Sequence, residues 1–182
     1  MNIMNINKNL TTRQNPRFIN AGQMFSSIPN QFEPIRKDLF SVEFPLEMNI
    51  PENLIASAAR PKITNAQKEV MFKNLSTYYK GKTKHETIQM TFRDTIGVSI
   101  FQKLQAWQRQ HTDFANGKGG YAATYKKTLT LNMEAPDGTV IQKFRLFGCF
   151  IIDIDGGEVN MDSDDIAMVT MTLSVDSSEL VL

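Results

Sequence analysis

Apolar and polar residues alternate over four segments of the chain, a pattern typical of half-buried β-strands. The segments are 39–46, 88–93, 127–133 and 168–175. In the last of them, Val169, Met171, Leu173 and Val175 alternate with Thr170, Thr172 and Ser174. After the third segment, 135–138 reads Ala-Pro-Asp-Gly, which supplies a fixed φ at Pro and a positive φ at Gly. The sequence therefore predicts a β-hairpin over 127–150.

One segment has a helical period instead. Between about 98 and 111, apolar residues recur at spacings of three and four, at Ile100, Phe101, Leu104 and Trp107, so we expect one amphipathic helix there. A glycine-containing loop over 114–121 follows. Many strands with one helix predict a mainly β (α+β) fold, an antiparallel sandwich or barrel with one flanking helix.

Two segments lack a sustained period. Residues 1–36 are rich in Asn and Gln and are interrupted by three prolines, so we expect an N-terminal extension or an assembly arm before a domain over 37–182. Apolar residues within it favour the arm: Phe18, Met24, Phe25, Ile28 and Phe32. Residues 48–85 are predicted as a long loop with a possible short strand over 69–72. Its tyrosines and basic residues are typical of a protein contact surface.

The chain has 182 residues, a formal net charge of +1 and 41 % hydrophobic residues. This size supports a core without disulfides or metals, and the near-neutral charge argues against a dedicated nucleic-acid binder. Charge is nevertheless uneven, because 150–182 contains acidic residues and no Lys or Arg, whereas 80–84 and 126–127 are basic. Opposite patches could register neighbouring copies; scattered solvated charges are the simpler alternative.

No catalytic or metal-binding motif is evident. Two histidines and the single cysteine, Cys149, do not have metal-ligand spacing, and we expect Cys149 to be a small buried hydrophobe. The acidic run over 153–165 does not match a calcium-binding EF-hand loop, so a solvated turn is favoured. We predict no enzyme and no cofactor.

The first ten residues lack the features of a signal peptide, and no apolar run reaches the roughly 20 residues of a membrane span, so we expect a soluble protein.

Several local strings, taken in order, resemble one protein family. They are Leu39–Phe44, Phe101–Gln108 with its Trp-Gln pair, Tyr125-Lys126-Lys127, Phe147-Gly148, and the acidic 162–165 followed by the strand over 168–175. This ordered set, over about three quarters of the chain, resembles the tail tube proteins of contractile-tailed bacteriophages. Two features depart from the family: the long extension, and Phe150-Ile151-Ile152 where a Pro is frequent.

The resemblance implies a structural virion protein that stacks as hexameric rings inside a contractile sheath and forms a channel for DNA delivery. It also implies assembly in the host cytoplasm. The implied partners are other copies of the chain, the sheath, baseplate and tail-terminator proteins, and transiently the tape-measure protein and genomic DNA; no membrane is implied. Alternatives are a tube-initiator or tail-terminator ring, or the inner tube of another contractile injection system. A capsid decoration protein is a more distant alternative, and a small β-barrel enzyme or nucleic-acid module is the most distant.

Two sets of residues follow as hypotheses. Neutral polar side chains would face the lumen, where they would hold water without binding DNA phosphates; an outer solvent face is the alternative. They are Thr87, Gln89, Thr91, Thr128, Thr130, Thr170, Thr172 and Ser174. Basic and aromatic residues of one subunit would meet acidic residues of a neighbour. They are Arg60, Lys62, Tyr78, Tyr79, Lys80 and Lys82 on one side and Asp155, Glu158, Asp162 and Asp164 on the other.

Overall fold

A computed structural model describes residues 34–182, so nearly all of the predicted extension over 1–36 lies outside the described residues. Residues Arg36–Leu182 form one compact unit. The strands are β1 (Phe40–Glu43), β2 (Ile55–Ala58), β3 (Ile63–Phe72), β4 (Leu75–His85), β5 (Ile88–Arg93), β6 (Lys127–Glu134), β7 (Val140–Asp155), β8 (Met168–Ser174) and β9 (Ser177–Leu180). The helices are α2 (Ile100–Arg109) and the short α3 (Ala122–Tyr125), with 3-10 turns η2 (Leu46–Met48) and η3 (Glu52–Leu54).

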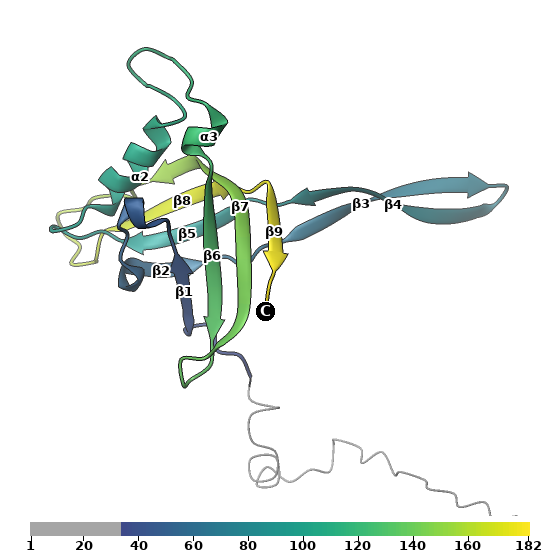
Figure 1. Cartoon of the computed structure of the whole chain (residues 1–182), viewed down its shortest axis with the longest axis horizontal. Helices are drawn as coiled ribbons and strands as arrows, with labels where there is room; N and C mark the ends of the chain where they lie inside the picture. The colour runs from purple at the N-terminus through teal and green to yellow at the C-terminus, as the bar shows by residue number, and fades with distance from the viewer. Residues whose placement is uncertain (1–33) are drawn as a thin grey trace, which may run out of the picture. The chain divides into compact units, whose positions relative to one another are not determined.

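Seven of the strands form one antiparallel sheet in the order β1-β6-β7-β8-β5-β2, and β9 also pairs with β7. The long strand β7 takes part in both layers of the fold. Its residues up to Cys149 pair with β6 and β9, and those from Phe150 pair with β8. We call β1, β6, β9 and the first part of β7 sheet A, and β2, β5, β8 and the last part of β7 sheet B. In Figure 1 the strands of sheet A run across those of sheet B.

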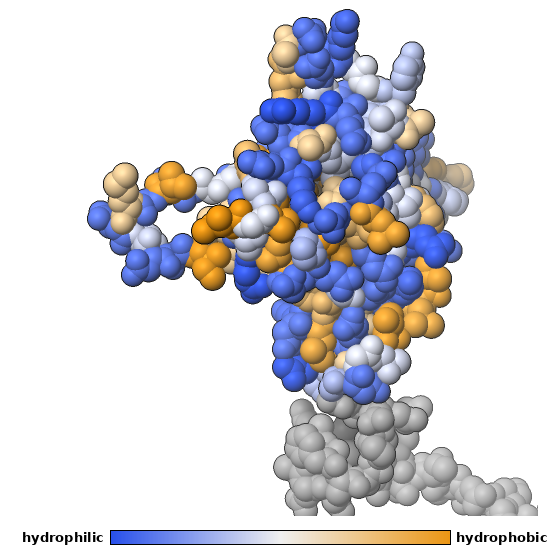
Figure 2. Space-filling view, turned by 60° about the vertical axis from the view of Figure 1, so that its left-hand side comes forward, coloured by the Kyte–Doolittle hydropathy of each residue, from blue (hydrophilic) through white to orange (hydrophobic). Residues whose placement is uncertain are grey.

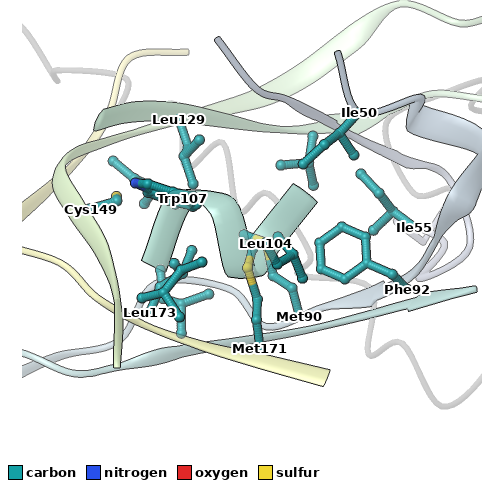
Figure 3. Close-up of a cluster of buried hydrophobic side chains, with 14 of the residues drawn as sticks. Ile50, Ile55, Met90, Phe92, Leu104, Trp107, Leu129, Cys149, Met171 and Leu173 are labelled. Atoms are coloured by element: carbon teal, nitrogen blue, oxygen red, sulfur yellow. The ribbon is translucent and has the colours of Figure 1, made fainter. Parts of the chain in front are cut away.

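The hydrophobic core lies between the two sheets and is closed by α2. Met90 and Leu173 of sheet B and Leu129 of sheet A are buried there, and Figure 3 shows Leu104 and Trp107 of α2 among them. The helix begins after Ser99, whose hydroxyl accepts from the backbone N–H of Gln102 at 3.4 Å, a standard N-cap. The core is thus built from the apolar positions of the alternating and helical patterns.

The predicted helix and the strands predicted over 88–93, 127–133 and 168–175 are confirmed, within one residue at their ends. The hairpin turn is confirmed as well, since Ala135 N–H donates to Thr139 O at 2.8 Å. The first strand is shorter than expected, because Pro45 leads into η2. The stretch 48–85 differs from the expected loop, since it contains η3, β2 and the β3–β4 hairpin. Every residue of β3 is exposed, so it lacks the alternation that marks a half-buried strand.

The Tyr125-Lys126-Lys127 string connects the start of β6 to four other parts of the fold. Lys126 Nζ lies 2.6 Å from Asp176 Oδ2, and Lys127 forms an ion pair with Glu47. The Tyr125 ring packs edge-on against Phe150 with centroids 5.6 Å apart, and its carbonyl accepts from Trp107 Nε1 at 2.7 Å. The string therefore joins α2, η2, β7 and the turn between β8 and β9 at one corner.

Candidate assembly surfaces

The β3–β4 hairpin projects from one end of sheet B, beyond the point where β2 and β5 end (Figure 1). Near its turn, Phe72 pairs with Leu75 and Val70 with Thr77, so these side chains share one face of the hairpin. Phe72 is 70 % exposed and Leu75 is 73 % exposed. Clustered apolar side chains this exposed on a projecting element indicate a surface that binds a partner.

The shape of the hairpin depends on a β-bulge. The register shifts between Asn65 and Gln67, and Gly81 lies against the bulge, because a Cβ added there would be 3.0 Å from both the Cβ and the carbonyl oxygen of Ala66. At the base, the backbone N–H of Ser178 donates to His85 Nδ1 at 3.2 Å. The bulge sets the local bend of the hairpin, and His85 fastens its base to β9.

The opposite end of sheet B carries two loops, 94–99 and 156–167, joined by a bond from Asp94 N–H to Ala167 O at 3.0 Å. Figure 1 shows these loops on the side away from the hairpin. Their apolar side chains at Ile96, Val159 and Met161 are almost fully exposed. Figure 2 brings this side forward and shows hydrophobic surface interspersed with hydrophilic surface. We call the two loops the acidic end, because 156–167 also carries Glu158, Asp162, Asp164 and Asp165.

The structure places the two predicted contact sets at these opposite ends. Tyr78, Tyr79, Lys80 and Lys82 lie exposed on β4, and Arg60 and Lys62 lie between β2 and β3. On the other side, Asp155 ends β7 and Glu158, Asp162 and Asp164 lie in the loop over 156–167. Within residues 34–182 no ion pair joins the two sets. Sequence reasoning missed the exposed apolar residues at both ends, although Val70-Met71-Phe72 and Val159-Asn160-Met161 are each flanked by charged residues.

Five of the predicted lumen residues share one face of sheet B, which we call the hydroxyl face. It comprises Gln89, Thr91, Thr170, Thr172 and Ser174. Thr91 and Thr170 pair directly, with hydroxyl oxygens 3.3 Å apart. Asp153 and Asp155 pair with Thr172 and Thr170 and therefore add carboxylates to this face.

The other three predicted lumen residues lie elsewhere. Thr128 and Thr130 are on β6 in sheet A, and Thr87 falls between β4 and β5. On β6 the same side of the sheet continues through Asn132, whose amide donates to Glu43 Oε1 at 2.7 Å. Lys143 Nζ lies 3.8 Å from that carboxylate. The outer side of sheet A is therefore charged and cross-linked by polar bonds, unlike the hydroxyl face.

Among residues 34–182 no cluster of three His, Cys, Asp or Glu side chains is placed to hold a metal ion. Cys149 is fully buried, and this burial raises the pKa of its thiol to about 12. His111 Nε2 donates to Ile151 O at 3.0 Å and its Nδ1 accepts from the Thr112 hydroxyl at 2.8 Å, so its ring fastens the end of α2 to β7. In this part of the chain, no helix has the length and apolar content to cross a membrane.

Comparison with known proteins gives no match to a family model and no match among curated proteins. Three solved structures are similar in fold. A chain of the sheath–tube complex of the extracellular contractile injection system PVC, in the extended state, has a TM-score of 0.65 and 18 % identity, over 89 % of this chain and 97 % of that one. A chain of the PVC sheath/tube terminator has a TM-score of 0.64 and 16 % identity, over 82 % and 98 %. The tube-terminating cap of the anti-feeding prophage has a TM-score of 0.64 and 16 % identity, over 81 % and 91 %.

The chain thus has the fold of structural parts of contractile injection systems. At this level of identity the likeness establishes the fold, and the predicted resemblance is confirmed to that extent. The neighbours are tube and terminator assemblies and not enzymes.

Proposed function

We propose that this protein is a structural subunit of the tube in a contractile phage tail or a related injection machine, where it stacks as hexameric rings inside a sheath. One observation carries the proposal. On a fold shared with tube and terminator assemblies, the two opposite ends of sheet B carry complementary surfaces: a basic and aromatic hairpin with an apolar tip, and the acidic end.

A contact between two different patches on identical subunits repeats from copy to copy and generates a stack. In this protein the hairpin of one ring reaches the acidic end of the next. Exposed charge pairs contribute only about 0–1 kcal/mol each. Phe72 and Leu75 on one side and Val159 and Met161 on the other therefore supply most of the affinity, and the charges set the register.

The hydroxyl face lines the channel in this proposal. Its neutral hydroxyl and amide groups, with the carboxylates of Asp153 and Asp155, hold water and repel phosphates. A channel lined with lysines would bind DNA by releasing its counterions. A phage tail would pass genomic DNA and its tape-measure protein through this channel, after assembly in the host cytoplasm.

Negative-stain electron microscopy of the purified full chain over a range of concentrations tests the proposal. We expect hollow tubes or stacked rings. Phe72→Asp should leave rings but abolish stacking, because the tip then carries a charge where the neighbour presents apolar side chains. The matched control is Leu46→Asp, since Leu46 is 97 % exposed but lies in η2. Equal loss of stacking in both variants would show that the tip has no special role.

A terminator ring is the second candidate, favoured by the likeness to two terminator structures. A terminator stops the growth of a stack, so the purified chain would form single rings that do not stack on one another. It would also be present in few copies in each particle. The same micrographs therefore separate a tube subunit from a terminator.

A further inference from the structure

One side chain, His85, holds the base of the β3–β4 hairpin to sheet A. The hairpin is connected to sheet B through the chain segments 59–62 and 86–87. Among residues 34–182, no hydrogen bond or ion pair other than those of His85 joins β3 or β4 to a strand of either sheet. The direction in which the hairpin leaves the sheets therefore depends strongly on this contact.

His85 caps an amide on the outer edge of β9. The inner edge of β9 pairs with β7, where Val181 N–H donates to Lys143 O at 2.8 Å. Because bonded and non-bonded pairs alternate along an antiparallel ladder, the N–H of Ser178 points away from β7. It donates to His85 Nδ1 at 3.2 Å, and the Ser178 hydroxyl oxygen lies 3.1 Å from the same nitrogen.

This contact requires the neutral form of the His85 ring. Nδ1 accepts from a backbone N–H when it carries no proton, which leaves the ring proton on Nε2. Protonation places a hydrogen on Nδ1, opposite the N–H of Ser178. The charged ring can still donate to the Ser178 hydroxyl, but the backbone amide then faces a donor. The bond from the β9 backbone to the hairpin is therefore lost in the charged form.

On the hairpin itself, the nearest charged residues are Lys84 and Glu86, which form an ion pair at 3.4 Å. Hydrogen bonding by Thr64, together with the charge of Lys84, holds the pKa of Glu86 below its usual range. Glu86 therefore stays ionised in mildly acid solution. Lys62, whose carbonyl accepts from the Glu86 N–H at 2.9 Å, adds a cation at the start of β3.

On the sheet, the nearest charged residues are Glu179 of β9 and Arg145 of β7, which pair with each other. They follow the period of two and lie on the side of sheet A away from the Ser178 side chain. Carboxylates, lysines and arginines ordinarily keep their charge between about pH 5 and pH 8, whereas histidine changes it. In this range the titrating group at the base of the hairpin is thus His85.

We propose that His85 is a pH-sensitive latch: the neutral ring fixes the base of the hairpin to β9, and protonation releases it. Since the latch needs the neutral ring, it is fully formed above the range in which histidine titrates and is lost as pH falls through that range. The inference rests on the proposed stacking role of the hairpin and adds its regulation. Stacks would then loosen in mildly acid solution.

Distance measurements between two spin labels in the full chain test the latch directly. The labels are placed at Ser76→Cys on β4 and Ile141→Cys on β7, and an excess of unlabelled protein limits the measurement to distances within one copy. The native Cys149 is fully buried and stays unlabelled. We expect a narrow distance distribution at about pH 8 and a broader one at about pH 5.

The matched control is His85→Asn, whose amide oxygen takes the place of Nδ1 and accepts at both pH values. Its distribution should stay narrow. His85→Ala has no acceptor and should be broad at both. A distribution that stays narrow in the native histidine chain at the lower pH, or that broadens equally in His85→Asn, overturns the latch.

Sedimentation of assembled stacks at the same two pH values measures the consequence. The protein concentration needed for stacking should rise at least about twofold at the lower pH, the worth of one weak hydrogen bond. His85→Asn should not show this rise, which also separates the latch from any titration of the acidic end. A latch that opens while stacking is unchanged overturns its regulatory role. A chain that stacks at neither pH contradicts the proposed function, and the spin-label distances still decide the latch.

Discussion

At the scale of single residues, Gly148 lies where β7 passes from sheet A to sheet B. Its φ is +64°, and a Cβ added there would lie 2.2 Å from Asp176 Oδ2, the carboxylate that Lys126 holds. The glycine therefore supplies both a left-handed backbone and room for an ion pair.

We expect Gly148→Ala to lower the free energy of unfolding by about 1–3 kcal/mol, because a non-glycine residue is strained at this φ and the carboxylate must move. Urea denaturation measures the change. Gly97→Ala is the control, since Gly97 has no atom within 4 Å of its added Cβ, and its effect should stay within about 0.5 kcal/mol. Similar losses in the two variants would contradict this role for Gly148.

Cys149 gives a second prediction at this scale. Burial raises the pKa of its thiol from 9.0 to about 12, so the folded protein should not react with a thiol reagent at pH 8, and unfolding should expose one reactive group. Because the folded state keeps its proton between these two values, this thiol makes the protein less stable as pH rises from 9 towards 12. Labelling followed by mass spectrometry checks the first point, and rapid labelling of the folded chain would refute it.

At the scale of elements, the sequence predicts a strand or a helix where one face is buried. In the strands β5 and β8 every second side chain enters the core, and in the helix α2 every third or fourth does. The hydrophobic period of each element is therefore visible in the sequence. In contrast, β3 is exposed throughout, and β9 has only four residues on the edge of sheet A. Neither could be predicted from its hydrophobic pattern, because burial does not select their residues.

The same reason limits what the sequence says about the candidate surfaces. A period of two separates the faces of each strand, and this places Thr170, Thr172 and Ser174 on one face. It does not say which strands become neighbours, so Thr128 and Thr130 could not be separated from the hydroxyl face before the topology was known.

The bulge of the hairpin provides a prediction for an element. Gly81→Val would place a branched side chain against Ala66, where even a Cβ is 3.0 Å from its neighbours, and the tip should change direction. We expect stacking to be lost while the free energy of unfolding, measured in urea, changes by less than about 0.5 kcal/mol, because the hairpin lies outside the core. Thr77→Val, on the same strand but away from the bulge, is the control. A tube that forms normally with Gly81→Val would show that the bend is unimportant for assembly.

At the scale of the whole molecule, the channel proposal distinguishes the two sheets. Assembled Thr172→Lys tubes should bind DNA, with an affinity that falls as salt rises, because each ring would present several cations to the lumen. Thr128→Lys, on sheet A, should not. Filter binding of DNA to assembled tubes at several salt concentrations measures both. DNA retention by the Thr128 variant alone would mean that sheet A lines the channel.

The placement of the hairpin and the acidic end on opposite sides of one sheet has a consequence for growth. A polymer built from such subunits is directional: one tip displays free hairpins and the other displays unoccupied acceptors. Elongation and capping must then be different reactions at the two tips, and a molecule that blocks one tip leaves the other free to grow. The polarity of a finished tube would thus be determined by the structure of each single subunit, before assembly begins.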